Sequence, residues 1–183
     1  MSVRVRSTLI ASSRAGLFKL GHREAYEAAL GPGAAAHLRD ASMIAQWLPM
    51  DDAVSHYGAA DAIGLSEAQM LEVGDVVGAR LEGALWGSVA RTARRAGFTP
   101  WTTLRRLDRI WGRMYDGDRV EVTQAGPKDA VIHIRDNPLC DILYWRVALS
   151  GLMKGTTEIF ARSAFVKVRA EGPGHARFDV AWA

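Results

Sequence analysis

Cysteine is nearly absent from this sequence, and its scarcity excludes several kinds of site. Cys140 is the single cysteine among 183 residues, so neither an intrachain disulfide nor a multi-cysteine zinc or iron–sulfur site can form. A lone cysteine favours a reducing, cytoplasmic location. No apolar run is long enough to cross a bilayer, and the first residues show no charged start followed by an apolar block. We therefore expect a protein that is neither exported nor membrane-spanning.

Lysine is also scarce, so arginine carries nearly all the positive charge. The formal net charge of +3 gives only a weak long-range field and does not favour nucleic acid as a partner. A composition of 49% hydrophobic and 23% charged residues is that of an ordinary globular chain. We predict one domain over residues 1–183, with a helical part at about 20–116 and a strand-rich part at about 117–183.

The motifs of common enzymes are absent as well. No glycine-rich loop follows a strand in the Rossmann or P-loop pattern, and no Gly-x-Ser-x-Gly elbow occurs. The five histidines have no partner at a metal-ligand spacing; they are His22, His37, His56, His133 and His175. Asp51 and Asp52 fit the first turn of a helix better than a catalytic pair. We predict no enzymatic activity and no metal.

The first half of the chain reads mainly as helices. The segment Val3–Ile10 is open between a strand and the start of a helix, and short helices are expected at His22–Leu30 and Ala34–Arg39. Asp51 or Asp52 begins a helix that reaches Ile63 and ends at Gly64.

Two longer helices are expected next. The first begins with Ser66 and Gln69 as a capping box and reaches Ala96, with a break possible at Gly74. Thr99 and Pro100 then supply an N-cap and a first-turn proline for a helix that reaches about Tyr115.

The helix at Pro100–Tyr115 is strongly amphipathic. Its apolar arc contains Trp101, Leu104, Leu107, Ile110, Trp111 and Met114, and its basic arc contains Arg105, Arg106, Arg109 and Arg113. The arginine arc is either a solvated face or a docking surface for an acidic partner, an anionic lipid or nucleic acid. Arg105, Arg109 and Arg113 are the docking candidates, and Arg91, Arg94 and Arg95 could extend the surface.

An internal repeat dominates the last third of the chain. Val120–Ile134 aligns without gaps with Val166–Val180, and both copies place a Gly-Pro pair between two alternating segments. Each copy is therefore a predicted β-hairpin, and two hairpins make a four-stranded antiparallel sheet.

A helix is expected between the hairpins, over Leu139–Arg162. The fold class is thus α+β, with N-terminal helices followed by ββ-α-ββ and the helices packed on one face of the sheet. The other face is polar and mixed in sign, which suits either solvent or a subunit contact.

Several aromatic side chains on predicted helices are pocket candidates. They either line an apolar pocket for a lipid-like or planar ligand or fill the core. Cys140, near the start of a predicted helix, is either a reactive or acylated thiol or a small buried side chain. The ligand-pocket candidates are Trp86, Trp101, Trp111, Cys140, Tyr144 and Trp145.

Five short segments stand out along the chain: Trp47–Met50, Gly97–Trp101, Arg113–Gly117, Gly126–Ala130 and Trp182. In these segments the chain resembles a family of domains of about this length found chiefly in myxobacteria. That family is similar in element order to the superfamily of 4-vinyl-reductase domains, heme–nitric-oxide-binding domains and transport-particle (TRAPP) subunits. The resemblance implies a sensory or scaffolding domain, often dimeric, with an apolar cavity between helices and sheet.

The sequence departs from each branch of this superfamily. The Tyr-x-Ser-x-Arg motif of the heme-binding branch and the cysteine cluster of the 4-vinyl-reductase branch are absent. Cys140 is the only candidate for the acylation seen in some transport-particle subunits. We therefore predict a non-enzymatic, cytoplasmic homodimer that binds an apolar small molecule or serves as a scaffold, with no cofactor and heme unsupported. The alternative is a regulator or adaptor whose arginine face docks an acidic protein.

Overall fold

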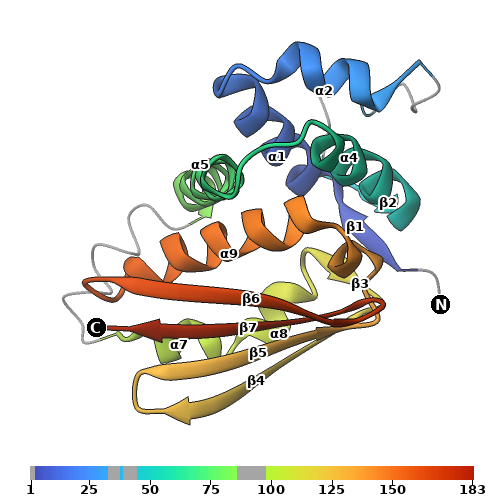
Figure 1. Ribbon diagram of the computed structural model, residues 1–183. Helices are drawn as coiled ribbons and strands as arrows, with labels where there is room; N and C mark the ends of the chain where they lie inside the picture. The colour runs from blue at the N-terminus through green and yellow to red at the C-terminus, as the bar shows by residue number, and fades with distance from the viewer. Residues whose placement is uncertain (1–2, 33–37, 39–44, 86–97) are drawn as a thin grey trace.

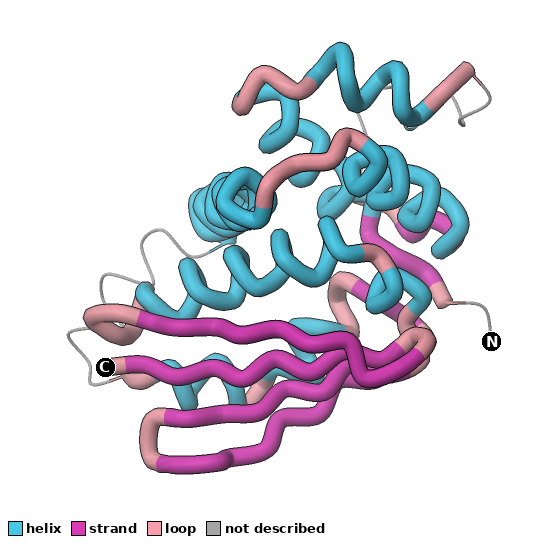
Figure 2. The backbone as a smooth tube through the Cα atoms, in the orientation of Figure 1, coloured by secondary structure: helices cyan, strands magenta, loops and turns pink. Residues whose placement is uncertain are grey.

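The computed structural model describes residues 3–32, 38, 45–85 and 98–183, and side chains at 80–85 lie outside the description. Helices are stacked over one face of a four-stranded antiparallel sheet, with a small three-stranded sheet at one end (Figures 1 and 2). The predicted α+β class is confirmed. The predicted helix at Ala34–Arg39 and the expected extension to Ala96, with Trp86, Arg91, Arg94 and Arg95, fall largely outside the described residues.

The first residues form both of the elements that the sequence left open. Strand β1 (Arg4–Arg6) leads directly into helix α1 (Ser7–Lys19), and α2 (Arg23–Leu30) follows. Strand β1 lies between two short strands, β2 (Trp47–Pro49) and β3 (Tyr115–Asp116). Tyr115 was expected in a helix, and this expectation is wrong because its backbone pairs with Val5.

Helix α4 (Met50–Ala62) begins and ends close to where the sequence predicted, and α5 (Glu67–Leu85) begins where predicted, whereas its expected end at Ala96 lies outside the described residues. The backbone turns left-handed at Gly64, with φ of +72°, a conformation that glycine adopts without strain. The capping box of α5 is present, since the Ser66 amide donates to Gln69 at 2.9 Å and the Gln69 amide donates to Ser66 Oγ at 3.4 Å.

Gly74 does not break α5, so that expectation is wrong. A Cβ at Gly74 would lie 2.0 Å from the Ala148 carbonyl oxygen, and a Cβ at Gly151 would lie 2.5 Å from the Leu71 carbonyl oxygen. The two glycines therefore let α5 cross α9 (Leu143–Glu158) with backbone nearly against backbone. In Figure 1, α9 lies between α5 and the sheet.

The amphipathic segment at Pro100–Tyr115 is two short helices, α7 (Pro100–Leu104) and α8 (Leu107–Trp111), instead of one. Two indole rings explain the break. Trp101 donates to the Pro127 carbonyl at 2.7 Å, and Trp111 donates to the Asp118 carboxylate at 2.9 Å. Each helix is thus held by a different loop of the sheet.

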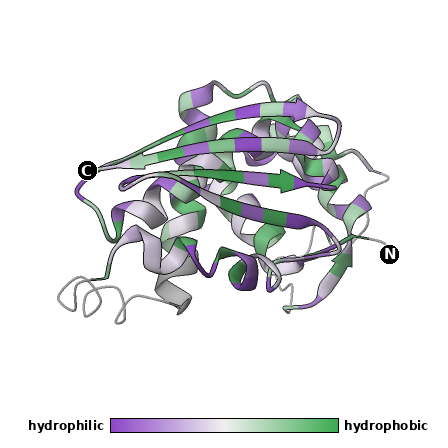
Figure 3. Ribbon diagram, turned by 90° about the horizontal axis from the view of Figure 1, so that it is seen from below, coloured by the Kyte–Doolittle hydropathy of each residue, from purple (hydrophilic) through white to green (hydrophobic). Residues whose placement is uncertain are grey.

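The hairpin repeat forms the four-stranded sheet. Its strands are β4 (Arg119–Gly126), β5 (Asp129–Arg135), β6 (Ala164–Gly172) and β7 (His175–Trp182), in the order β4-β5-β7-β6. Polar and apolar residues alternate along each strand (Figure 3). The apolar face carries the buried side chains Ile132, Ile134 and Phe178, which α9 and the other helices cover.

The predicted single helix over Leu139–Arg162 is shorter and begins differently. A 3₁₀ turn (Pro138–Asp141) precedes α9, because the Asn137 side chain accepts from the Leu139 amide at 2.9 Å and caps the tighter turn. The outer face of the sheet carries ion pairs from Asp179 to Arg169 and Arg177.

Candidate functional site

A group of buried rings runs through the interior, from the contact between α2 and α4 to α9, the short strand β3 and helix α8. We call it the ring cluster; it consists of Tyr26, His56, Tyr57, Trp111, Tyr115, Tyr144 and Trp145, all no more than 5% exposed. The rings contact one another in sequence, with centroid distances of 5.3 Å for Tyr26–His56, 4.6 Å for His56–Tyr57 and 4.5 Å for Trp111–Tyr115. The ring cluster therefore runs from α2 to α8 through the interior.

His56 has an incomplete set of hydrogen bonds. Its Nδ1 lies 2.7 Å from the Tyr26 hydroxyl, but its Nε2 is buried without a hydrogen-bond partner. Burial, with a smaller effect of Arg14, lowers the pKa of His56 to about 3. The imidazole is consequently neutral at physiological pH, which is the form that binds metals.

The other polar atoms of the ring cluster have partners. The Tyr144 hydroxyl lies 3.0 Å from Ser13 Oγ, and Trp145 Nε1 donates to the Tyr115 hydroxyl at 3.1 Å. Burial raises the pKa of Tyr57, Tyr115 and Tyr144, so these phenols stay protonated. Among the described residues of the cluster, His56 Nε2 is thus the polar atom left without a partner.

Sequence reasoning passed over His56 because no second histidine stands at a metal-ligand spacing. The available signal was its position on α4, where Ala53, His56, Tyr57 and Ala60 recur at the spacing of one helix face and are all buried. A histidine on an apolar face was visible in the sequence, but its partner Tyr26 was not.

The structure separates the proposed pocket residues into two groups. Trp111, Tyr144 and Trp145 lie together in the ring cluster, whereas Trp101 lies half-buried against Trp182 at a centroid distance of 5.2 Å. Trp86 lies outside the described residues.

Cys140 is fully buried. Burial, with smaller effects of Asp141 and Asp118, raises the pKa of the Cys140 thiol to about 12. A thiol in this environment is protonated and weakly nucleophilic.

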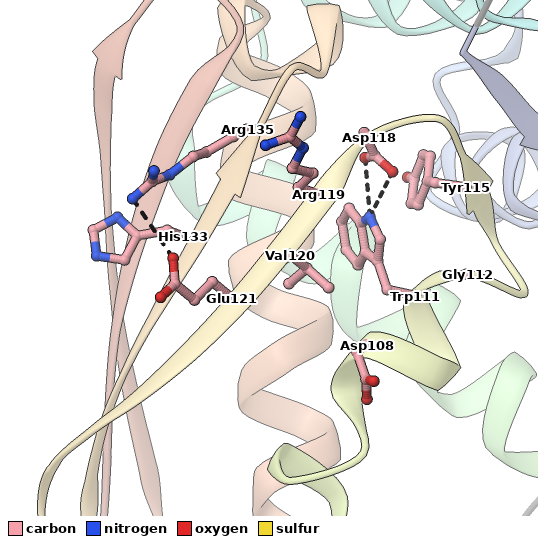
Figure 4. A pocket seen from close by; sticks show the side chains of 10 residues that line it. All are labelled: Asp108, Trp111, Gly112, Tyr115, Asp118, Arg119, Val120, Glu121, His133 and Arg135. Carbon is pink, nitrogen blue, oxygen red and sulfur yellow. Dashed lines mark hydrogen bonds and ion pairs between the residues drawn. The ribbon is translucent and has the colours of Figure 1, made fainter. Parts of the chain in front are cut away.

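A second feature is a groove between α8 and the edge strand β4, with a volume of about 410 Å³. Figure 4 shows Val120 pointing toward Trp111, with Asp118 above them. Asp118 accepts from Trp111 Nε1 at 2.9 Å and from Asn137 Nδ2 at 2.7 Å. Burial raises the pKa of Asp118. The lining residues are Asp108, Trp111, Gly112, Tyr115, Asp118, Arg119, Val120, Glu121, His133 and Arg135.

Two of the arginine docking candidates, Arg109 and Arg113, directly follow the groove-lining residues Asp108 and Gly112, whereas Arg105 caps the end of α7. Arg105, Arg109 and Arg113 are exposed, as is Arg106. Within the described residues, no group of three or more His, Cys, Asp or Glu side chains is placed to hold a metal ion. In that same part of the chain, no helix is both long and apolar enough to cross a membrane.

Comparison with known proteins identifies the fold. No family model and no curated protein matches the chain. Solved structures do match, and the H-NOX protein of K. algicida in its Fe(II) unliganded form has a TM-score of 0.68 at 10% identity over 97% of this chain and 96% of that one. The fold is that of H-NOX domains.

Two further H-NOX structures agree with this assignment. An oxygen-binding H-NOX domain related to soluble guanylate cyclases matches with a TM-score of 0.57 at 14% identity, covering 94% of this chain and 91% of that one. A structure from a study of heme distortion in the H-NOX family matches with a TM-score of 0.59 at 13% identity, with the same coverage. The resemblance to the heme–nitric-oxide-binding superfamily is thus supported at the level of fold.

The comparisons contradict the expectation of no cofactor. The similar structures are described as containing Fe(II) or heme. The absence of the Tyr-x-Ser-x-Arg motif is therefore not enough to exclude heme from a chain of this fold. The described residues fit such a group in their donor chemistry. Imidazole is an axial ligand of heme iron, and His56 Nε2 is a neutral, unpartnered imidazole nitrogen among apolar rings.

Proposed function

We propose that this chain is a sensory domain that binds heme in the ring cluster, where His56 Nε2 would hold the iron. The single observation that carries the proposal is the unpartnered Nε2 of His56, buried in the interior of an H-NOX fold. The domain acts by binding, without catalysis of its own. The homodimer and the cytoplasmic location remain predictions from the sequence.

The energetics of His56 support a ligand at this atom. A buried polar atom without a partner costs about 1–3 kcal/mol, more than most single contacts contribute to stability. Binding of Nε2 to a metal removes the penalty.

The other nitrogen of His56 is already positioned for such a role. In the tautomer that binds a metal through Nε2, Nδ1 carries the hydrogen and donates it to the Tyr26 hydroxyl at 2.7 Å, which fixes the ring orientation and aims Nε2 in one direction. Metal-binding histidines are commonly held through the second nitrogen in this way. Tyr26 is thus a positioning residue for His56.

The surrounding rings exclude water from His56. Tyr57 and Tyr144 are 5% and 0% exposed, and their rings lie 6.2 Å apart by centroid. Heme, when bound, supplies an iron atom that can take a diatomic gas as its further ligand. Because the rings contact one another, entry of a planar group requires them to separate, and their displacement links occupancy to the packing of α4 and α9.

The test is titration of the purified protein with hemin, followed by the Soret band. We expect saturable binding to the wild type and at least a tenfold weaker affinity for His56→Gln. Tyr26→Phe keeps the ring but loses the hydroxyl, and we expect a loss of about tenfold.

His133→Gln is the matched control, because His133 lies on the face of β5 opposite the buried Ile132 and Ile134, where it pairs with Glu171 at 3.0 Å, and it is no member of the ring cluster. Far-UV circular dichroism establishes that each variant is folded. The absence of saturable binding by the wild type, or equal affinity of the wild type and His56→Gln, would refute the proposal.

A further inference from the structure

The groove between α8 and β4 has arginines on both sides. On the sheet side, Arg119 and Arg135 line the groove, with side chains 82% and 53% exposed. Each makes only a long ion pair of 3.6 Å, to Asp136 and Glu121 respectively. Exposed ion pairs at this separation contribute little to stability, so both guanidinium groups can leave these carboxylates for those of a ligand.

On the helix side, the arginines follow from the geometry of α8. Asp108 and Gly112 line the groove, and Arg109 and Arg113 each come one residue later. One residue corresponds to 100° of rotation around a helix, so Arg109 stands on the rim and outside the groove. Arg106 and Arg113 flank the two ends of α8 (Leu107–Trp111), and both are exposed.

These helix arginines carry charge that the described part of the chain leaves unpaired. Arg106, Arg109 and Arg113 are exposed, and no ion pair is found for them among residues 3–32, 38, 45–85 and 98–183. Arg4, by contrast, pairs with Asp116 on β3 nearby. The rim is therefore a cationic row beside a groove whose wall includes Trp111 and Val120.

We infer that this groove and its arginine rims dock an acidic segment of a partner protein. The five residues of α8 span about 7.5 Å at 1.5 Å per residue, so Arg106 and Arg113, beyond its two ends, frame a length of at least two to three residues of extended peptide. The partner segment carries Asp or Glu toward the arginines, which bind carboxylates through two parallel hydrogen bonds.

The pattern of charge favours a protein over a nucleic acid. Asp108, Asp118 and Glu121 line the groove between the two sets of arginines. A phosphate backbone carries uniform negative charge and meets these carboxylates with repulsion. An acidic peptide can place its carboxylates at the rims and an apolar side chain against the half-buried Val120, which matches the alternation of charged and apolar groups in the groove.

The test uses a fluorescein-labelled peptide of ten glutamates with one leucine at its centre and measures anisotropy at low salt with the full chain. We expect saturable binding that weakens as salt rises. We expect Arg106→Gln/Arg109→Gln/Arg113→Gln to bind at least tenfold more weakly. The matched control, Lys19→Gln/Arg162→Gln/Lys167→Gln, removes the same charge from exposed positions elsewhere and should retain wild-type affinity within about twofold.

Three outcomes would overturn the inference. The rim variant could bind as tightly as the wild type, or the control could lose as much affinity as the rim variant, which would reduce the effect to net charge. A twenty-base-pair duplex DNA, bound more tightly than the peptide and with the same dependence on the rim arginines, would assign the surface to nucleic acid. None of these outcomes depends on heme, so the two proposals fail independently.

Discussion

The crossing of α5 and α9 gives a sharp prediction at Gly74. An added Cβ would lie 2.0 Å from the Ala148 carbonyl oxygen, whereas ordinary contacts begin at 3.4 Å. The obstacle is backbone, so the two helices must move apart by more than 1 Å. Such overpacking costs up to about 3 kcal/mol, and replacing glycine by alanine in a helix returns about 1 kcal/mol. We therefore expect Gly74→Ala to lower the free energy of unfolding by about 2 kcal/mol.

Gly58→Ala is the matched control, because Gly58 lies inside α4 and an added Cβ there would meet nothing within 4 Å. Gly58→Ala should gain only the higher helix propensity of alanine and raise the free energy of unfolding by up to about 1 kcal/mol. Urea unfolding measures both changes. In thermal scans, Gly74→Ala should lower the Tm by about 4–8 °C and Gly58→Ala should raise it by about 2–4 °C. A Gly74→Ala protein as stable as the wild type would show that the helices do not cross this closely.

Two predictions concern buried titratable groups. The folded pKa of His56 is about 3 and the unfolded value is 6.5, so the unfolded chain binds a proton that the folded chain does not, and stability falls as pH drops below 6.5. At pH 5 the difference in the pKa of His56 lowers the free energy of unfolding by about 2 kcal/mol, and His56→Gln should remove this loss. If the free energy of unfolding, measured with urea, fell equally with pH in the wild type and in His56→Gln, the prediction would be contradicted. The Cys140 thiol, with its pKa raised to about 12, should react with a thiol reagent at pH 8 at least 100-fold more slowly in the folded than in the urea-unfolded protein, and comparable rates would contradict its burial.

The sequence predicts those parts of the fold whose signals are local. The hairpin repeat places Val120 opposite Ile134 and Val166 opposite Val180, because alternation fixes both the register and the buried face. Helix ends follow from Gly64 and from the capping box at Ser66 for the same reason.

The features that sequence reasoning missed depend on distant contacts. Strands β1 and β3 contain two or three residues each, too few to show a period, and Val5 meets Tyr115 across more than a hundred residues. The break between α7 and α8 depends on where Pro127 and Asp118 hold two indoles. Gly74 looks like a helix breaker until the position of α9 is known.

In the candidate site, too, some residues have a local sequence signal and others depend on distant contacts. Trp111, Tyr144 and Trp145 could be chosen as pocket residues from composition and helical spacing alone. His56 could not, because its significance rests on Tyr26 satisfying one ring nitrogen while the other has no partner. A hydrogen-bond deficit is a property of the packed interior and has no signature along the chain.

Trp111 belongs to both proposed sites and gives the last prediction. Its ring stacks on Tyr115 in the ring cluster, and its indole N–H faces Asp118 in the groove. A ligand that moves the rings therefore moves the wall of the groove. By thermodynamic linkage, each ligand must change the affinity of the other by the same factor. We expect hemin to change the affinity for the ten-glutamate peptide by about fivefold or more, and Trp111→Phe, which loses the bond to Asp118, to reduce that change. If both ligands bind and the peptide affinity is the same with and without hemin, the ring cluster and the groove act separately.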